Sequence, residues 1–153
     1  MPLDATLIRG KLFQGSAPPL GSDLCWAGFD AVVLAAREFQ PESWKIPGVR
    51  VIRVPLDDIN VPLTFNELRD VRLAAQTIAA MLHHGKKVLV TCWLGLNRSG
   101  LIVAETLCRY WGMSPIQAIH LVRSKRGPSA LSNSSFVHAI VTDCKREVRA
   151  CAG

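Results

Sequence analysis

The stretch KVLVTCWLGLNRSGLIVAETLCRYW (residues 87–111) leads from an apolar strand through a short loop into a long apolar helix. Its first part, Lys87–Thr91, is the continuous apolar run typical of a buried strand. Its last part, Ser99–Trp111, is apolar almost all round, which predicts a central buried helix. The loop Cys92–Arg98 joins the two directly, so this stretch already indicates an α/β fold.

The rest of the chain supplies strands first and helices later. We expect an edge hairpin of Leu7-Ile8 and Leu12-Phe13, followed by strands at Ala31–Leu34 and at Val49–Val54, the last ended by Pro55. Helices are predicted from Thr64, which forms a capping box with Glu67, to Gly85, from Ser114 to Lys125, and from Asn133 to Arg149. The fold class is therefore α/β: one domain, residues 1–153, with a central, mostly parallel sheet of about five strands flanked by helices.

Composition narrows the class of protein. Hydrophobic residues make up 49% of the 153 residues and charged residues 20%, which excludes a disordered chain. Runs such as Ala31–Ala36 are too short to span a bilayer, and the first residues carry no secretory signal. The five cysteines include no C-x-x-C pair, as expected of free thiols in a reducing compartment. We therefore expect a cytoplasmic monomer with no membrane partner and no bound metal. The formal net charge of +6 suits anionic partners such as phosphoesters, nucleic acid or acidic lipids.

The chemistry is concentrated in the loop between the strand and the buried helix. Its amides and the helix N-terminus point toward one spot and create an anion site, and Gly95 lets the backbone curl. Arg98 is placed to hold two oxygens of a tetrahedral oxyanion. The same positive field favours the thiolate form of Cys92, and the hydroxyl of Ser99 is placed to donate a hydrogen bond to that sulfur.

The pattern C-x-x-G-x-x-R-S-G (residues 92–100) resembles the signature of cysteine-dependent protein tyrosine phosphatases, in particular the small dual-specificity branch. Similar segments cover nearly the whole chain: Leu12–Ser16, Phe29–Leu34, Val54–Asp58, Gly112–Ile119 and Leu131–Phe136. The resemblance implies a phosphatase-like fold and hydrolysis of phosphotyrosine, and of phosphoserine or phosphothreonine, in a phosphorylated protein through a phosphocysteine intermediate. It implies no cofactor and no metal, because the anion site itself supplies positive charge.

The resemblance also implies a role for individual residues. Cys92 is the nucleophile, Arg98 and the loop bind the phosphoryl group, Ser99 assists the sulfur, and an aspartate is the general acid. The register apolar-Pro-x-x-Asp favours Asp58 over its neighbour Asp57 as that acid. The substrate-binding loop residues are Trp93, Leu94, Gly95, Leu96 and Asn97. Asn133 is a further candidate, either orienting water or ligand or capping a helix.

One departure from the family pattern and one further resemblance keep alternatives open. The family commonly has histidine where this chain has Thr91, which predicts weaker tuning of the cysteine and leaves open a catalytically inactive phosphate-binding module. The stretch Gly-x-Asn-Arg-x-Gly (residues 95–100), which contains Asn97, also resembles the loop of metal-independent RNA 5′-triphosphatases, so an RNA 5′-triphosphate is an alternative substrate. A phosphoinositide is a second non-protein alternative for the same chemistry. A nucleic-acid partner is disfavoured, because the basic clusters Lys86-Lys87, Arg123–Arg126 and Lys145-Arg146 are interpreted as solvated faces. Trp26, Trp44 and Trp111 are expected to pack against the fold.

Overall fold

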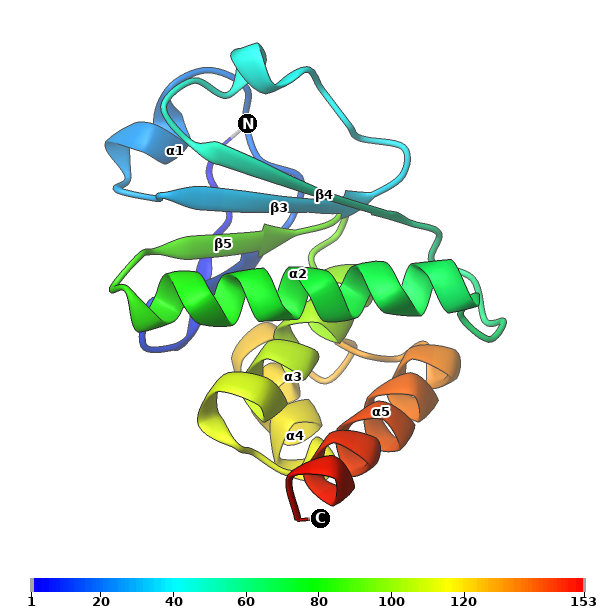
Figure 1. Cartoon of the computed structure of the whole chain (residues 1–153). Coiled ribbons are helices and arrows are strands. Elements are labelled where there is room, and N and C mark those ends of the chain that lie inside the picture. Colours follow the sequence, from blue (N-terminus) through cyan, green and yellow to red (C-terminus); the bar gives the residue numbers. More distant parts are fainter. Residues whose placement is uncertain (1, 153) are drawn as a thin grey trace.

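The computed structural model describes residues 2–152 of the chain, and it describes side-chain surroundings for residues 2–144. The strands are β1 (Thr6–Arg9), β2 (Leu12–Gly15), β3 (Ala31–Ala36), β4 (Arg50–Leu56) and β5 (Val88–Thr91). The helices are α1 (Asp23–Trp26), the 3₁₀ turn η1 (Ser43–Lys45), α2 (Phe65–His83), α3 (Arg98–Trp111), α4 (Pro115–Arg126) and α5 (Ser134–Ala152). The strands form one sheet in the order β1-β2-β5-β3-β4 (Figure 1).

The sheet is mostly parallel, as predicted. Only β1 runs antiparallel, to β2, whereas β2–β5, β5–β3 and β3–β4 are parallel pairs. In the centre, β3 and β5 are fully buried, which explains why their sequences are continuous apolar runs rather than alternating ones. The expected five-stranded α/β architecture is therefore confirmed.

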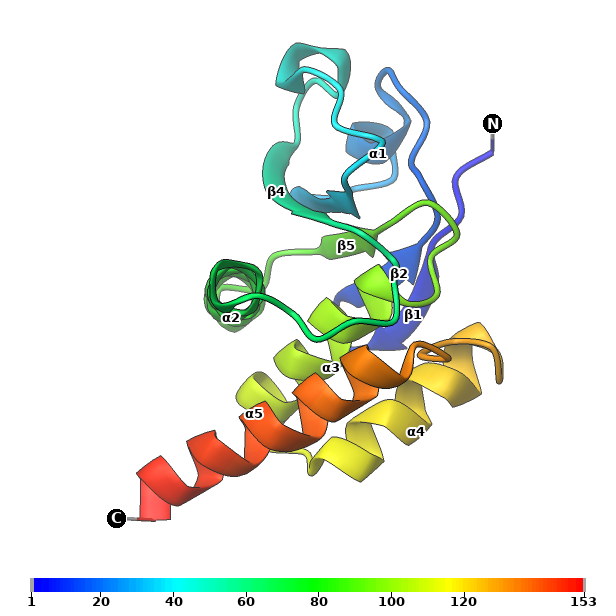
Figure 2. The ribbon, with the colours of Figure 1, turned by 90° about the vertical axis from the view of Figure 1, so that its right-hand side faces the viewer.

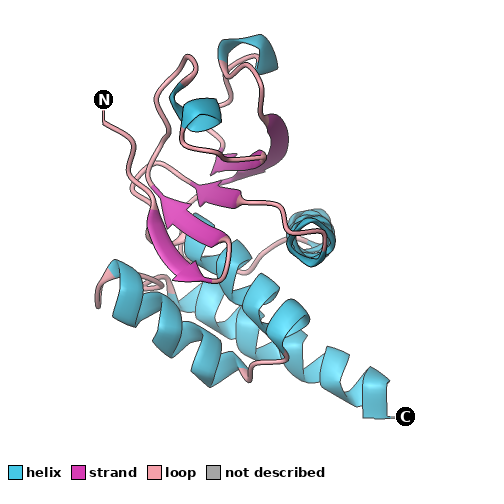
Figure 3. Cartoon of the chain, turned by 90° about the vertical axis from the view of Figure 1, so that its left-hand side faces the viewer, coloured by secondary structure: helices cyan, strands magenta, loops and turns pink. Residues whose placement is uncertain are grey.

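Helices cover the two faces of the sheet unequally. Alternate strand residues, such as Val33 and Val90, join α2, α3, α4 and α5 in the larger hydrophobic core. Their neighbours Val32 and Leu89 face a smaller core closed by α1 and by Ile46, next to η1. Figure 2 shows α2 end-on and α1 on the opposite side of β4 and β5, and Figure 3 shows the longer helices gathered on one side of the strands. The apolar helix α3 lies at the centre of the larger core, against α2, α4 and α5.

Local sequence signals set the ends of the helices. Thr64 and Glu67 form the predicted capping box at the start of α2. A second capping box, formed by Ser114 and Gln117, precedes α4, which has Pro115 in its first turn. Gly112 ends α3 in the left-handed conformation, with φ of 65°.

The prediction that Pro55 ends the fourth strand is wrong, because β4 continues to Leu56. Since β4 is an edge strand, a residue without an N–H group is tolerated there. The prediction that Trp26 and Trp44 pack inside the fold is also wrong, because they are 82% and 74% exposed. Trp111 is partly buried against the core, as expected. The side chains of the Lys145-Arg146 pair and of Cys151 lie outside the described residues.

The parallel strands bring four loops to one edge of the sheet. The segments that follow β2, β3, β4 and β5 begin at residues 16, 37, 57 and 92, and they leave the same ends of neighbouring strands. In parallel α/β sheets this edge is where ligands bind. Across residues 2–152, no helix is long and apolar enough to cross a membrane.

Candidate active site

Every carbonyl of the loop from Trp93 to Leu96 is held from outside the loop. The Trp93 carbonyl accepts from Ala17 N at 3.2 Å, and the Leu96 carbonyl accepts from Leu131 N at 3.3 Å. The Leu94 carbonyl accepts from Arg126 Nη2 at 3.3 Å. The Gly95 carbonyl accepts from Arg126 Nε at 2.9 Å and from Gln14 Nε2 at 3.1 Å. We call residues 92–97 the phosphate loop.

These outward carbonyls determine where the amides of the phosphate loop point. In a trans peptide unit the C=O and the following N–H point in opposite directions. The N–H groups of residues 94–97 are therefore turned to the inner side of the loop, and none of them donates a hydrogen bond to another described residue. Together with the N-terminus of α3, which begins at Arg98, they form a preorganised cradle for an anion.

Cys92 lies at the start of this cradle and is 3% exposed. Its Sγ lies 3.3 Å from the Oγ of Ser99, in the first turn of α3. The preceding residue, Thr91, does not contribute to the sulfur's surroundings as a histidine would, because its Oγ1 donates to the carbonyl of Val33 at 2.7 Å. The cysteine and the serine are thus brought together as the sequence predicted.

Arg98 is fixed in the cradle by an unpredicted partner, Glu38, from the loop after β3. Nη1 and Nη2 donate to the two carboxylate oxygens of Glu38, each at 2.6 Å, and Nη1 also donates to the Leu56 carbonyl at 2.9 Å. These bonds occupy one edge of the guanidinium. On the adjacent edge, Nε is buried and has no partner among the described residues. That edge, formed by Nε and the remaining N–H of Nη2, is the one with which an arginine can bind an oxyanion bidentately.

The ion pair changes the titration of both partners. Hydrogen bonds from Arg98 lower the pKa of Glu38 to about 2, against a smaller opposing effect of burial. The same hydrogen bonds raise the pKa of Arg98, and the nearby Cys92 and Asp58 add to this effect. The guanidinium therefore stays charged and oriented throughout the physiological pH range.

The structure separates the two neighbouring aspartates after β4. Asp58 turns toward the phosphate loop, where Asn97 Nδ2 donates to its Oδ2 at 3.0 Å and Asn133 Nδ2 donates to its Oδ1 at 3.0 Å. Asp57 instead forms an ion pair with Arg37 at 3.1 Å, and both of these side chains are about half exposed, at 49% and 52%. Asp58 is therefore the aspartate that lies with the phosphate loop.

Asn133 caps a helix, which is one of the two roles that sequence reasoning left open, and it also contacts Asp58. Its Oδ1 accepts from the backbone N–H of Ser135 at 3.0 Å, in the first turn of α5, as a helix cap does. Its Nδ2 donates to Asp58 and also to the Ile59 carbonyl at 2.9 Å. The backbone N–H of Asn133 donates to Oδ1 of Asn97 at 3.1 Å, so the α4–α5 loop, the phosphate loop and the Asp58 loop are tied together.

Arg126 corrects our interpretation of one basic cluster as a solvated face. Its side chain is only 10% exposed, and its two Nη groups pair with the carboxylate of Asp4 at 2.8 and 3.0 Å. These bonds lower the pKa of Asp4. The same guanidinium binds the phosphate loop as described above, so it braces that loop from behind. Gly95, with φ of 72°, lies so close to this brace that an added Cβ would sit 2.4 Å from Arg126 Nη2.

Sequence reasoning missed Glu38, Gln14 and Arg126. Glu38 was within reach, because it follows a fully buried strand and so lies at the same sheet edge as Cys92. Gln14 carried a signal too, as an amide in an otherwise apolar central strand. Arg126 carried no signal beyond its charge, because its contacts with the phosphate loop lie 31 and 32 positions away in the chain, and those with the N-terminal segment 120 and 122.

The rim of the phosphate loop is apolar. Trp93 and Leu94 are 50% and 66% exposed, and the ring of Phe39 lies 6.2 Å from that of Trp93. Leu96 is half-buried and packs against the larger core. Trp93 and Leu94 thus form the outer wall of the site, while Leu96 anchors the loop to the fold.

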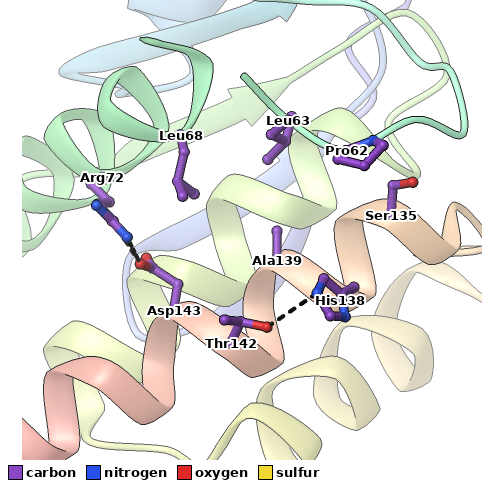
Figure 4. Close-up of a pocket in the computed structure, with 9 residues that line it drawn as sticks. All are labelled: Pro62, Leu63, Leu68, Arg72, Ser135, His138, Ala139, Thr142 and Asp143. Atoms are coloured by element: carbon purple, nitrogen blue, oxygen red, sulfur yellow. Dashed lines mark hydrogen bonds and ion pairs between the residues drawn. The ribbon is translucent and has the colours of Figure 1, made fainter. Parts of the chain in front are cut away.

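A separate hollow lies beyond the Asp58 loop, between α2 and α5 (Figure 4). Pro62 and Leu63 line it from the end of that loop, and an ion pair between Arg72 and Asp143 closes one side, with Arg72 Nε 2.6 Å from Asp143 Oδ1. None of the predicted site residues lines this hollow. It shows instead how the far end of the Asp58 loop rests on the two helices. Among residues 2–144, no group of three or more His, Cys, Asp and Glu side chains is placed to hold a metal ion.

With this geometry established, comparison with known proteins is decisive. The family model of the dual specificity phosphatase catalytic domain matches residues 13–145. The chain belongs to the dual-specificity phosphatase family. It is 33% identical over 140 residues to dual specificity protein phosphatase 1 of Arabidopsis thaliana, covering 88% of this chain and 66% of that protein. It is 32% identical over 139 residues to human dual specificity phosphatase 28, covering 88% of this chain and 76% of that protein.

Solved structures of dual-specificity phosphatases have the same fold. The crystal structure of human DUSP28 has a TM-score of 0.81 at 27% identity and covers 97% of each chain. A mouse putative dual specificity phosphatase, crystallised in complex with zinc tungstate, has a TM-score of 0.82 at 28% identity and covers 99% of this chain and 92% of that one. The predicted resemblance to this family, and its phosphatase-like fold, are confirmed.

Proposed function

We propose that this dual-specificity phosphatase family member hydrolyses phosphomonoesters through a phosphocysteine intermediate on Cys92. The observation that carries the proposal is the phosphate loop itself. Its carbonyls are bound outward, the amides of residues 94–97 have no partner among the described residues, and the unpartnered Nε belongs to Arg98, whose charge Cys92 and Asp58 lie near enough to stabilise. Such an arrangement binds a tetrahedral oxyanion and stabilises the added charge of a transition state without reorganising.

The proposed reaction has two steps. The Cys92 thiolate attacks phosphorus, the bond from phosphorus to the ester oxygen breaks, and Asp58 protonates the leaving oxygen. A water molecule then attacks the phosphocysteine, the Asp58 carboxylate takes its proton, and the sulfur–phosphorus bond breaks to release phosphate. The amides and Arg98 hold the phosphoryl oxygens in both steps, and the Ser99 hydroxyl, 3.3 Å from Sγ, stabilises the departing sulfur.

We propose phosphotyrosine in a protein as the preferred substrate, with phosphoserine and phosphothreonine accepted. The exposed Trp93 ring and the neighbouring Phe39 ring support this choice, because they offer an aromatic wall beside the cysteine. The Asn97 amide, which suggested an RNA 5′-triphosphatase, is used within the chain to bind Asp58 and Asn133. This internal use favours the protein phosphatase over the RNA-directed enzyme.

Hydrolysis of para-nitrophenyl phosphate in EDTA tests the proposal, with orthovanadate as inhibitor and Cys92→Ser as the matched control. We expect vanadate-sensitive turnover by the wild type and none by the variant. A panel of phosphotyrosine, phosphoserine and phosphothreonine peptides, a short-chain phosphoinositide and an RNA 5′-triphosphate then ranks the substrates by kcat/KM.

Two outcomes would contradict the proposal. Folded wild-type protein that binds vanadate but turns over no member of the panel would be a phosphate-binding module. A kcat/KM for the phosphoinositide or the RNA 5′-triphosphate well above that for every peptide would keep the cysteine chemistry and overturn the substrate.

A further inference from the structure

Gln14 is an unusual residue for an interior strand of a sheet. It lies on β2, between β1 and β5, and its side chain is 0% exposed. Its Oε1 is buried and has no hydrogen-bond partner among the described residues. A buried acceptor without a partner costs stability, and such a group in a native structure calls for an explanation.

The amide of Gln14 points at two groups of the phosphate-loop region. Nε2 donates to the Gly95 carbonyl at 3.1 Å and to Oγ of Ser99 at 3.1 Å. Chemistry assigns the amide's orientation, because the reversed amide would place Oε1 against the Gly95 carbonyl, and two acceptors repel. The Oε1 without a partner is thus the consequence of turning both N–H bonds toward the site.

The contact with Ser99 bears on the direction of a single hydrogen atom. A serine hydroxyl has one hydrogen to donate, and it rotates to suit its neighbours. The bond from Gln14 takes one of the two lone pairs of the Ser99 oxygen, and the hydrogen of Ser99 then faces its other neighbour, Cys92 Sγ, at 3.3 Å, which accepts when it is a thiolate. Ser99 has no further hydrogen-bond partner among the described residues.

We propose that Gln14 is a positioning residue for the nucleophile: it directs the Ser99 hydroxyl hydrogen toward the Cys92 sulfur and so favours the thiolate. The chain has a particular need for such a device. The hydroxyl of Thr91, where relatives of this family commonly carry histidine, is bound to the Val33 carbonyl and cannot serve the sulfur. The role in turnover rests on the proposed function, whereas the effect on the sulfur does not.

The variant Gln14→Met separates this role from a structural one. Methionine has a similar length, and it removes both hydrogen bonds together with the unpartnered Oε1. The substitution leaves neither former partner of Gln14 without a hydrogen bond. The Gly95 carbonyl still accepts from Arg126 Nε at 2.9 Å, and the Ser99 hydroxyl still contacts Cys92 Sγ. We therefore expect thermal stability equal to or above that of the wild type, with a less reactive cysteine.

The measurement is the rate of Cys92 alkylation by iodoacetamide across pH, followed on the Cys92 peptide by mass spectrometry. At a fixed pH below the midpoint, we expect Gln14→Met to react about three- to tenfold more slowly than the wild type, because the Ser99 oxygen, no longer bound by Gln14, is available to accept from the Cys92 thiol and stabilise its protonated form. Ser99→Ala should show a similar loss. Adding Gln14→Met to Ser99→Ala should change the rate no further, because Gln14 acts through the serine.

Each other outcome overturns the proposal. An unchanged alkylation profile in Gln14→Met means that the amide does not act on the sulfur. A full additional loss in the double variant means that it acts without Ser99. A marked loss of stability in both Gln14→Met and the second variant Gln14→Leu means that the amide is kept for folding. Because alkylation needs no phosphoester, these results hold even if the wild type hydrolyses no substrate.

Discussion

Replacing Asp58 with asparagine removes the acidic group and keeps the size of the side chain. In the structure Asn97 and Asn133 each donate one hydrogen bond of 3.0 Å to a different oxygen of Asp58. An asparagine at position 58 offers one acceptor oxygen, so one of these donors faces an NH₂ group. A neutral hydrogen bond contributes about 1 kcal/mol, equivalent to about a fivefold loss from misplacement of the loop. Loss of general acid catalysis adds about 10²- to 10⁴-fold.

The leaving group separates these two effects. We would measure kcat/KM, which reports the steps up to cleavage of the ester bond, for para-nitrophenyl phosphate and for a phosphoserine peptide. The nitrophenolate needs little protonation, so with para-nitrophenyl phosphate Asp58→Asn should lower kcat/KM only about fivefold, through the misplaced loop. With the phosphoserine peptide, kcat/KM should fall by this roughly fivefold loss multiplied by the loss of acid catalysis. The control Asp57→Asn, which removes only a half-exposed ion pair with Arg37, should stay within about twofold on both. Equal losses of kcat/KM with the two substrates in Asp58→Asn, or a larger loss in Asp57→Asn, would refute the assignment of Asp58 as the general acid.

Three further substitutions test the frame around the phosphate loop. Glu38→Gln should lower kcat/KM about tenfold, because it weakens the 2.6 Å pair that orients Arg98. The pKa of Glu38 is about 2, below its ordinary value of 4.5. Between these two pH values the folded protein binds fewer protons than the unfolded chain, so the stability of the wild type falls as the pH drops from 4.5 toward 2. Since Glu38 is half exposed, its pairing with Arg98 contributes less than about 1 kcal/mol to the free energy of unfolding. Thermal melts of Glu38→Gln should lack this acid-dependent contribution, and an unaltered acid dependence would contradict the pairing. Arg126→Met should weaken vanadate binding about tenfold by calorimetry, since the Leu94 and Gly95 carbonyls lose a shared donor, and unchanged affinity would show that the brace is dispensable. Gly95→Ala should abolish vanadate binding, because its Cβ would sit 2.5 Å from the Gly15 backbone, whereas Gly112→Ala, at a positive φ in open space, should keep it.

Much of the fold and the centre of the site could be predicted because their signals are local. The apolar strand before Cys92 and the apolar helix after it place the loop between them without knowledge of the rest of the chain. The α2 capping box depends on residues three positions apart, and it forms as expected. Asp58 could be favoured over Asp57 from the register of the resemblance, and the structure places it with Asn97 and Asn133.

The parts that could not be predicted depend on contacts between distant segments. Glu38 reaches Arg98 across 60 positions, and Gln14 reaches Ser99 across 85. No local pattern tells which charged residue will meet which loop once the strands are ordered. Pro55 illustrates the same limit, because whether a proline ends a strand depends on whether that strand lies at the edge. Trp26 and Trp44 are exposed for no reason that their local sequence reveals.

Trapping the phosphocysteine tests the central claim most directly. Asp58→Asn should form the intermediate from para-nitrophenyl phosphate but hydrolyse it slowly, because it lacks the base that activates water. After an acid quench within one turnover, mass spectrometry should find one phosphoryl group on the peptide that contains Cys92, and none in Asp58→Asn combined with Cys92→Ser. A phosphoryl group on any other residue, or turnover by the variant lacking the cysteine, would contradict the account.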